Sequence, residues 1–259
     1  TNKHKNDKED AKELADCLRT NRIPPAYVCP REFRPIRKLL RRRNKYVKNR
    51  TELISFQGND VMAEGHLPLS VHPRSKAKWR ESVRNSHDDP DSILVSEMDI
   101  QMIESCDRAI AEMEKRIEAH ALETNSQAYH IIRSLPGIGK VLALTILYET
   151  INIRRFPTVK NYVSYSRLVC GSNSSAGKDY GSRGRKMGNP YLKWAFMQAA
   201  VLCKRSDEQL ARYAEKLKRK HGKYTANAIM GAKIARAIYF MLDRKTTLSP
   251  ELLIKGKRR

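Results

Sequence analysis

The residues with the clearest potential for chemistry lie in one stretch, residues 167–194, which reads RLVCGSNSSAGKDYGSRGRKMGNPYLKW. Five of the twelve glycines lie here, and glycine lets the backbone adopt positive φ and approach another molecule closely. Ser174 and Ser175 offer nucleophilic hydroxyls, and arginine presents a fork of donors that matches phosphate. The cations of the stretch are Lys178, Arg183, Arg185 and Lys186. Two interpretations stay open: a flexible basic loop that grips a polyanion, or a loop that presents a hydroxyl to a phosphodiester.

A second candidate consists of two carboxylates near the start of the sequence. Asp7 and Asp10 are three residues apart in a segment whose apolar spacing predicts a helix to about residue 20, so both carboxylates point the same way. Such a pair can contribute hard oxygen ligands to Mg²⁺. The pattern is also typical of an ordinary helix start, with Asp7 as the N-cap and Asp10 in the first turn. The spacing alone favours the cap.

The net charge limits the class of partner. The 259 residues include 51 Lys and Arg but only 28 Asp and Glu, which gives a formal charge of +23. A folded chain this basic repels itself unless a polyanion neutralises it, and DNA or RNA is the usual one. No apolar run approaches the length of a spanning helix, and the five scattered cysteines form no zinc or disulfide pattern. We expect a cytoplasmic protein with reduced thiols, a nucleic-acid partner and no membrane association.

Two long helices are predicted before the serine-rich stretch, over about residues 31–57 and 92–123. Apolar residues repeat every seven positions in both, at positions 40, 47 and 54 in the first and 103, 110 and 117 in the second. This repeat predicts an antiparallel coiled-coil arm or a dimerisation element. The weakly patterned residues between them, 58–92, predict an irregular insertion or linker, with a helix N-terminus at its end in HDDPDS.

The first of these helices has a face that is almost purely cationic. No acid four residues away offsets the repulsion, so we expect a nucleic-acid backbone to lie along this helix. The residues predicted to contact it are Arg37, Lys38, Arg41, Arg42, Arg43 and Lys45.

Residues 134–140, SLPGIGK, predict a tight turn of the helix-hairpin-helix type. Gly137 and Gly139 permit a turn whose N–H groups face a phosphate at the next helix N-terminus, beside Lys140. Such turns also connect helices for structural reasons alone, and a helix-hairpin-helix repair enzyme would need a downstream aspartate that is absent. Asn189 and Pro190 predict a new helix start, with helices at about residues 191–204, 207–221 and 224–242.

Several segments, in this order, resemble the transposases of the insertion-sequence one-hundred-and-ten family, the bridge-RNA-guided recombinases. The segments are KNDKEDAKELADCL, IPPAYVCPREFRPIRKLLRRRNKYVKNRTELI, LPGIGKVLALTIL, FPTVKNYVSYSRLV, SNSSAGK and GNPYLKWAFMQAA. The resemblance implies a mainly α fold in four parts. These are the remnant of an RNase H-like (RuvC-like) domain with the basic helix (residues 1–57), a linker and coiled-coil helix (58–124), a helical transposase domain with the helix-hairpin-helix (125–243), and a basic tail (244–259).

The resemblance also implies an enzyme that cuts and rejoins DNA through a serine nucleophile. Ser175 matches that serine best, and Ser174 is the alternative because Ala176 stands where the family pattern has a glycine. Asp7 and Asp10 match the last two of the four carboxylates, the DEDD set, that hold Mg²⁺. The implied partners are double-stranded DNA, a structured guide RNA and further copies of the chain joined through the coiled coil, in the nucleoid-containing cytoplasm of a bacterium or archaeon.

The first Asp and the Glu of the DEDD set have no match in this sequence. The expectation is therefore a truncated form that binds nucleic acid but does not cut or rejoin it alone. The alternative is a non-enzymatic DNA- or RNA-binding module derived from such a transposase, in which the serines are only loop residues.

Overall fold

The computed structural model describes residues 6–23, 27–65, 76–169, 174–175, 178–179, 187–249 and 251–254, and these residues are mainly helical. The chain divides into two compact units, Thr1–Arg34 and Pro35–Arg259. The first contains helix α1 (Asp7–Arg19) and a 3₁₀ turn, η1 (Arg31–Phe33). Asn6, rather than the predicted Asp7, is the N-cap of α1: its side-chain oxygen accepts a hydrogen bond from the Lys8 N–H at 3.1 Å.

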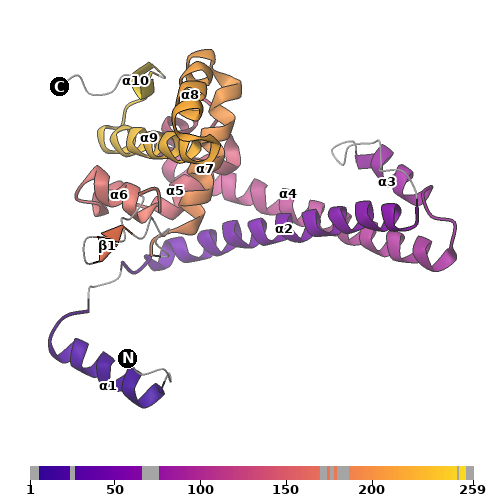
Figure 1. The fold of residues 1–259 in the computed structure, drawn as a ribbon, viewed down its shortest axis with the longest axis horizontal. Helices are drawn as coiled ribbons and strands as arrows, with labels where there is room; N and C mark the ends of the chain where they lie inside the picture. The colour runs from indigo at the N-terminus through magenta and orange to yellow at the C-terminus, as the bar shows by residue number, and fades with distance from the viewer. Residues whose placement is uncertain are drawn as a thin grey trace. The chain divides into compact units, whose positions relative to one another are not determined.

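The second unit is built on two long helices, α2 (Arg34–Ala63) and α4 (Pro90–Arg133), which lie side by side (Figure 1). Three polar contacts show that they are antiparallel, because the partners move backward along α4 as they move forward along α2. The contacts are Arg43 to Glu114 at 2.6 Å, Arg50 to Asp107 at 2.7 Å, and Gln57 to Asp99 at 2.8 Å. Both helices carry buried apolar residues, including Leu40, Ile103, Ile110 and Ile117. The supercoil of a true coiled coil stays a prediction.

The prediction of an irregular linker over residues 58–92 is wrong for much of that segment. Helix α2 continues to Ala63, and a further helix, α3 (Lys76–Arg84), precedes α4. Trp79 and Val83, four residues apart, are buried against Ile100 and Ile103 of α4, with Leu53 and Ile54 of α2 packed against the same cluster. The sequence pattern missed α3 because Trp79 and Val83 are the only large apolar residues in its nine positions, too few to reveal an amphipathic helix.

The predicted start of α4 is confirmed. Asp89 is the N-cap, since its carboxylate accepts hydrogen bonds from the backbone N–H groups of Asp91 and Ser92, and Pro90 occupies the first helical position. The helix runs beyond the predicted end at residue 123, with an interruption at Asn125, whose φ of −144° and ψ of 38° are not helical.

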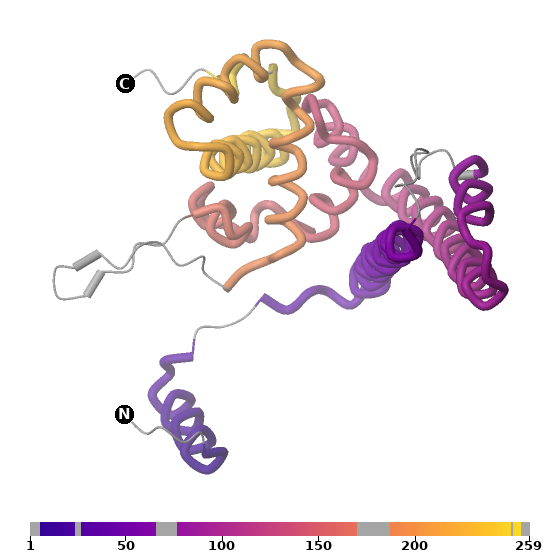
Figure 2. The backbone as a smooth tube through the Cα atoms, turned by 45° about the vertical axis from the view of Figure 1, so that its right-hand side comes forward, coloured from indigo at the N-terminus to yellow at the C-terminus, as the bar shows by residue number. Residues whose placement is uncertain are grey.

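The rest of the second unit is a cluster of helices that gathers around α7 and α9 (Figures 1 and 2). Its elements are α5 (Lys140–Thr150), η2 (Ile153–Arg155), α6 (Val159–Tyr165), α7 (Pro190–Ser206), α8 (Glu208–His221), α9 (Lys223–Arg244) and α10 (Glu251–Ile254). The three predicted C-terminal helices are confirmed as α7, α8 and α9. In the predicted tail, α10 buries Leu253, and residues 255–259 lie outside the described residues. Within the described parts of the chain, no helix combines the length and apolar character needed to cross a bilayer.

The predicted turn before α5 packs closely against α7. Gly137 has a φ of +82°, and a Cβ atom added there would lie 2.3 Å from the backbone nitrogen of Cys203. Gly139, the N-cap of α5, has a φ of −78° and open space where a Cβ would be. Gly137 is therefore required by the packing of the turn, whereas Gly139 is not.

We predict that Gly137→Ala lowers the free energy of unfolding by about 2–4 kcal/mol, because the methyl group meets backbone atoms that cannot move aside and the backbone conformation is strained. Gly139→Ala is the matched control, with an expected decrease below about 1 kcal/mol. Urea titrations followed by circular dichroism measure both. Equal decreases in the two variants would contradict the close approach of the turn to α7.

Candidate functional site

The serine-rich stretch connects α6 to α7. Its described part contains two short antiparallel strands, β1 (Ser174–Ser175) and β2 (Lys178–Asp179), with Ser175 paired to Lys178. The backbone pairing thus brings residues 174–175 opposite residues 178–179, and a role of these residues in chemistry stays a prediction. Arg183, Arg185 and Lys186 lie outside the described residues.

The two ends of this stretch are held together at a stem formed by residues 165–167 and 188–189. The Asn189 N–H donates to the carbonyl oxygen of Tyr165 at 2.6 Å, and Arg167 Nε donates to the carbonyl oxygen of Gly188 at 3.0 Å. Gly188 has a φ of +108°, and a Cβ atom there would lie 2.5 Å from the Tyr165 oxygen. The stem therefore closes the loop at its base, and Gly188 allows the close approach.

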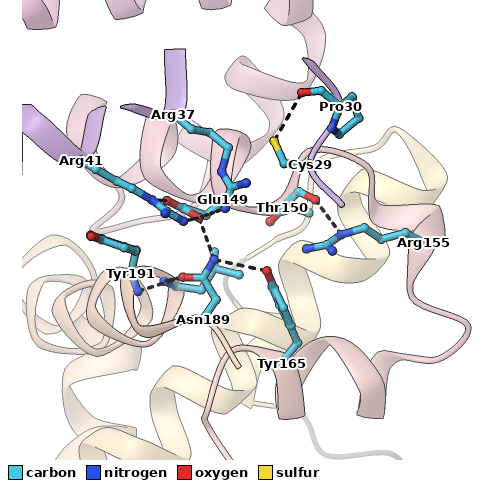
Figure 3. A network of polar contacts seen from close by, with 11 residues as sticks. Cys29, Pro30, Arg37, Arg41, Glu149, Thr150, Arg155, Tyr165, Asn189 and Tyr191 are labelled. Carbon is cyan, nitrogen blue, oxygen red and sulfur yellow. Dashed lines mark hydrogen bonds and ion pairs between the residues drawn. The ribbon is translucent and has the colours of Figure 1, made fainter. Parts of the chain in front are cut away.

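A buried carboxylate, Glu149, lies beneath the stem. It is the penultimate residue of α5 and has no exposed surface. Its two oxygens accept hydrogen bonds from Arg37 Nη2 at 2.7 Å, from Arg41 Nε at 2.7 Å and Nη2 at 2.8 Å, and from Asn189 Nδ2 at 2.7 Å (Figure 3). We call these four residues the Glu149 cluster. It joins α2, α5 and the first residue after the serine loop.

Asn189 has two roles in this cluster. Its amide nitrogen donates to Glu149, while its Oδ1 accepts from the backbone N–H groups of Tyr191 at 2.9 Å and Leu192 at 3.2 Å. The second pair of bonds caps α7, as the Asn–Pro pattern predicts. A single side chain thus ties the start of α7 to the buried carboxylate.

The electrostatics of the cluster favour an ionised glutamate. Burial raises the pKa of Glu149 because it penalises the charged form, but the hydrogen bonds from Arg41, Arg37 and Asn189 together outweigh burial and leave the pKa below its ordinary value. Pairing with Glu149 in turn raises the pKa of Arg41. One negative charge and two positive charges therefore share the site at neutral pH.

Aromatic residues support the stem from the neighbouring helices. The Arg155 guanidinium lies over the rings of Phe156 and Tyr165, 4.3 and 4.5 Å from their centroids, and donates to the carbonyl oxygen of Thr150 at 3.1 Å. Arg41 lies 4.6 Å from the centroid of the Tyr191 ring. These contacts add cation–π attraction to the charge pairing around the loop base.

The structure separates the predicted cations of α2 into two groups. Arg37 and Arg41 face Glu149, and Arg43 pairs with Glu114, so acids on other helices compensate these three although none lies four residues away on α2. Their partners come from α4 and α5, far away in the sequence. Lys38, Arg42 and Lys45 are exposed and form no ion pair with any described residue. Contact of any of the six with nucleic acid stays a prediction.

The other predicted site residues lie elsewhere. Lys140, the first residue of α5, places its Nζ 3.6 Å from Glu114 and 3.4 Å from Glu118.

Asp7 and Asp10 are exposed in the first turn of α1. Among the described residues, no three His, Cys, Asp or Glu side chains gather closely enough to hold a metal ion. Asp7 and Asp10 could supply two oxygen ligands, which is a partial set for Mg²⁺, and binding of that metal stays a prediction.

Sequence reasoning missed Glu149. The available signal was one acid inside an otherwise apolar helix, VLALTILYET, since a carboxylate in such a run must find a partner or remain outside the core. The partners Arg37 and Arg41 are more than one hundred positions away, and no local pattern connects them to it.

Comparison with known proteins finds two similarities that include this region. Residues 129–215 match the model of a family described as the transposase IS116/IS110/IS902 family. The chain is also 28% identical over 137 residues to the insertion element IS110 uncharacterized 43.6 kDa protein of Streptomyces coelicolor, an alignment that covers 53% of this chain and 32% of the relative. The chain thus spans about a third of the length of that curated relative. Both findings support the family that the sequence motifs resemble, and the matched segment contains Glu149 and the serine stretch.

We predict that Glu149→Gln lowers the free energy of unfolding by about 3 kcal/mol at pH 7, because two guanidinium groups then lose their buried counter-charge. Glu215→Gln, which removes an exposed pair with Lys218, is the control and costs less than about 1 kcal/mol. Urea titration measures both variants.

The difference in unfolding free energy between the wild type and Glu149→Gln should depend on pH. Since the pKa of Glu149 is lowered in the folded protein, its stabilising contribution is present above the ordinary glutamate pKa of about 4.3 and is lost as the pH falls through the lower folded value. The stability gap between wild type and Glu149→Gln therefore shrinks below about pH 4. A gap that widens on acidification would show that the ionised form is not the stabilising one.

Proposed function

We propose that the chain is part of an IS110-type transposase that cuts and rejoins DNA through a serine nucleophile, with Ser175 as that nucleophile and Ser174 as the alternative. The observation that carries the proposal is that the family match, residues 129–215, includes the whole serine stretch. The stem joins the two ends of this stretch and contacts the buried Glu149 cluster. The proposal also includes Mg²⁺, held by carboxylates that include Asp7 and Asp10, and a structured guide RNA. These two parts rest only on the resemblance to the family.

The proposed chemistry is a phosphoryl transfer in two steps. The serine Oγ attacks a DNA phosphorus; the Oγ–P bond forms, the bond from phosphorus to one deoxyribose oxygen breaks, and the serine proton is given up as the leaving oxygen becomes a hydroxyl. A DNA hydroxyl later attacks the phosphoserine, which releases the serine and rejoins the strand. Lys178, Arg183 and Arg185 would balance the charge that develops on the phosphate oxygens.

DNA contact is assigned to the outward cations of α2. Lys38, Arg42 and Lys45 follow one another at spacings of four and three residues, so they lie along one face of a helix over a length of about 10 Å. A straight row of charges of this kind suits the phosphates of a duplex. The turn with Gly137 and Gly139 borders a hollow of about 530 Å³ that Arg133 and Arg205 also line, and it is a second place for a backbone phosphate.

We predict that, in a complete enzyme with the full carboxylate set, the nucleophile variant loses the covalent protein–DNA adduct and keeps its affinity for DNA. Ser175→Ala and Ser174→Ala, each assayed on nicked suicide substrates by denaturing gel electrophoresis, decide between the two serines. If each single variant still forms the adduct, the serine mechanism is excluded and the alternative of a nucleic-acid-binding module is favoured.

The role of α2 is tested by the salt dependence of duplex binding. The triple variant Lys38→Gln, Arg42→Gln, Lys45→Gln should reduce the log–log slope of affinity against salt by about 0.9 for each phosphate that the protein no longer neutralises. Arg108→Gln, Lys115→Gln, Arg116→Gln removes the same charge from exposed positions on α4 and is the control. Fluorescence anisotropy with a labelled duplex measures both. Equal slope changes in the two variants would show a general effect of net charge instead of a DNA contact along α2.

A further inference from the structure

A second cationic surface lies far along the chain from α2, where α8 ends and α9 begins. We call residues 216–224 the α8–α9 tip; they read KLKRKHGKY. All of them except Leu217 are exposed. Lys218 pairs with Glu215 at 3.3 Å, whereas Lys216, Arg219, Lys220 and Lys223 form no ion pair with any described residue. The tip therefore presents a dense positive charge that the described part of the chain leaves uncompensated.

An exposed aromatic side chain directly follows these cations in the sequence. Tyr224 is 83% exposed, the highest value among the large apolar side chains of the described residues. It lies in the first turn of α9, which is held in place by buried Ala226 and by Asn227, whose side-chain oxygen accepts a hydrogen bond from Lys204 Nζ at 2.6 Å. The phenol ring is thus carried on a helix start that packs against the rest of the unit, and most of its own surface is exposed.

Helix stability alone explains only part of this composition. Cations in the last turn of a helix interact favourably with its dipole, which accounts for Lys218, Arg219 and Lys220 at the end of α8. The helix dipole does not explain Lys223, which begins the next helix. Fold stability does not explain Tyr224 either, because a ring that stays in water contributes no burial free energy.

Several exposed cations and an exposed ring on one short segment are typical of surfaces that bind unpaired nucleotides. The cations follow the phosphates, while the ring stacks on a base, and stacking requires a base that is not already paired in a duplex. We infer that the α8–α9 tip binds a single-stranded stretch of nucleic acid, with Tyr224 stacked on one base and Lys216, Arg219, Lys220 and Lys223 near its phosphates. The inference rests on the proposed function for the source of such a strand, because strand exchange exposes unpaired nucleotides.

The test measures binding of the 259-residue chain to two fluorescein-labelled probes, a 20-nucleotide oligothymidine and a 20-base-pair duplex. Tyr224→Ala should weaken oligothymidine binding by about fivefold or more, where fivefold is the smallest effect expected for the loss of one stacked base. Its affinity for the duplex should stay unchanged. Tyr224→Phe keeps a ring and should bind like the wild type. The variant Lys216→Gln, Arg219→Gln, Lys220→Gln, Lys223→Gln should lower the salt slope for oligothymidine by about 0.7 for each phosphate left without a cation.

Two outcomes would overturn the inference. Unchanged oligothymidine binding by Tyr224→Ala would exclude stacking, and equal weakening of both probes would show a general electrostatic surface without preference for single strands. Circular dichroism melting curves check that the variants, all at exposed positions, remain folded. Neither outcome changes the result of the serine adduct assay. Absence of the adduct in that assay, in turn, does not change the binding measured at the α8–α9 tip, so the two proposals can be tested independently.

Discussion

The central constraint in the second unit is the burial of one negative charge. An ionised carboxylate without access to water is very costly unless charged partners and hydrogen bonds surround it. Glu149 meets this requirement with two guanidinium groups from α2 and one amide from the start of α7. If α2, α5 or α7 moved away, the Glu149 carboxylate would become exposed or would lose a hydrogen-bond partner. The position of the long helix α2 and the end of the serine loop therefore depend on the same interaction.

This arrangement gives the arginines of α2 a structural role beside any role in binding. Arg37, Arg41 and Arg43 turn inward to acids on α5 and α4, while Lys38, Arg42 and Lys45 remain in solvent on the same helix. The division follows the chemistry of the two cations: arginine offers a planar fork that suits a buried carboxylate, whereas lysine is more strongly hydrated. Arg42 shows that helix register, and not residue type alone, decides which way a side chain faces. The exposed cations of α2 thus remain available to a polyanion.

Local signals in the sequence predicted local structure well. The caps at Asp89 and Asn189, the glycine turn before α5 and the helices α7 to α9 all follow from patterns within a few residues. Features that depend on distant contacts were not predictable in the same way. Trp79 is buried because α2 and α4 pass beside it, and Glu149 is satisfied by residues more than one hundred positions away. At the site, sequence reasoning identified the serine stretch, but not the buried charge that closes its stem.

Amide hydrogen exchange in residues 187–193 tests most directly whether the Glu149 carboxylate holds the end of the serine loop. The N–H groups of Asn189, Tyr191 and Leu192 are hydrogen-bonded within the stem and its cap, so they should exchange slowly in the intact chain. In Glu149→Gln their exchange should accelerate strongly, while the amides of the α8–α9 pair remain protected. Unchanged protection of the stem in that variant would show that other interactions hold the loop end and would contradict the central role of Glu149.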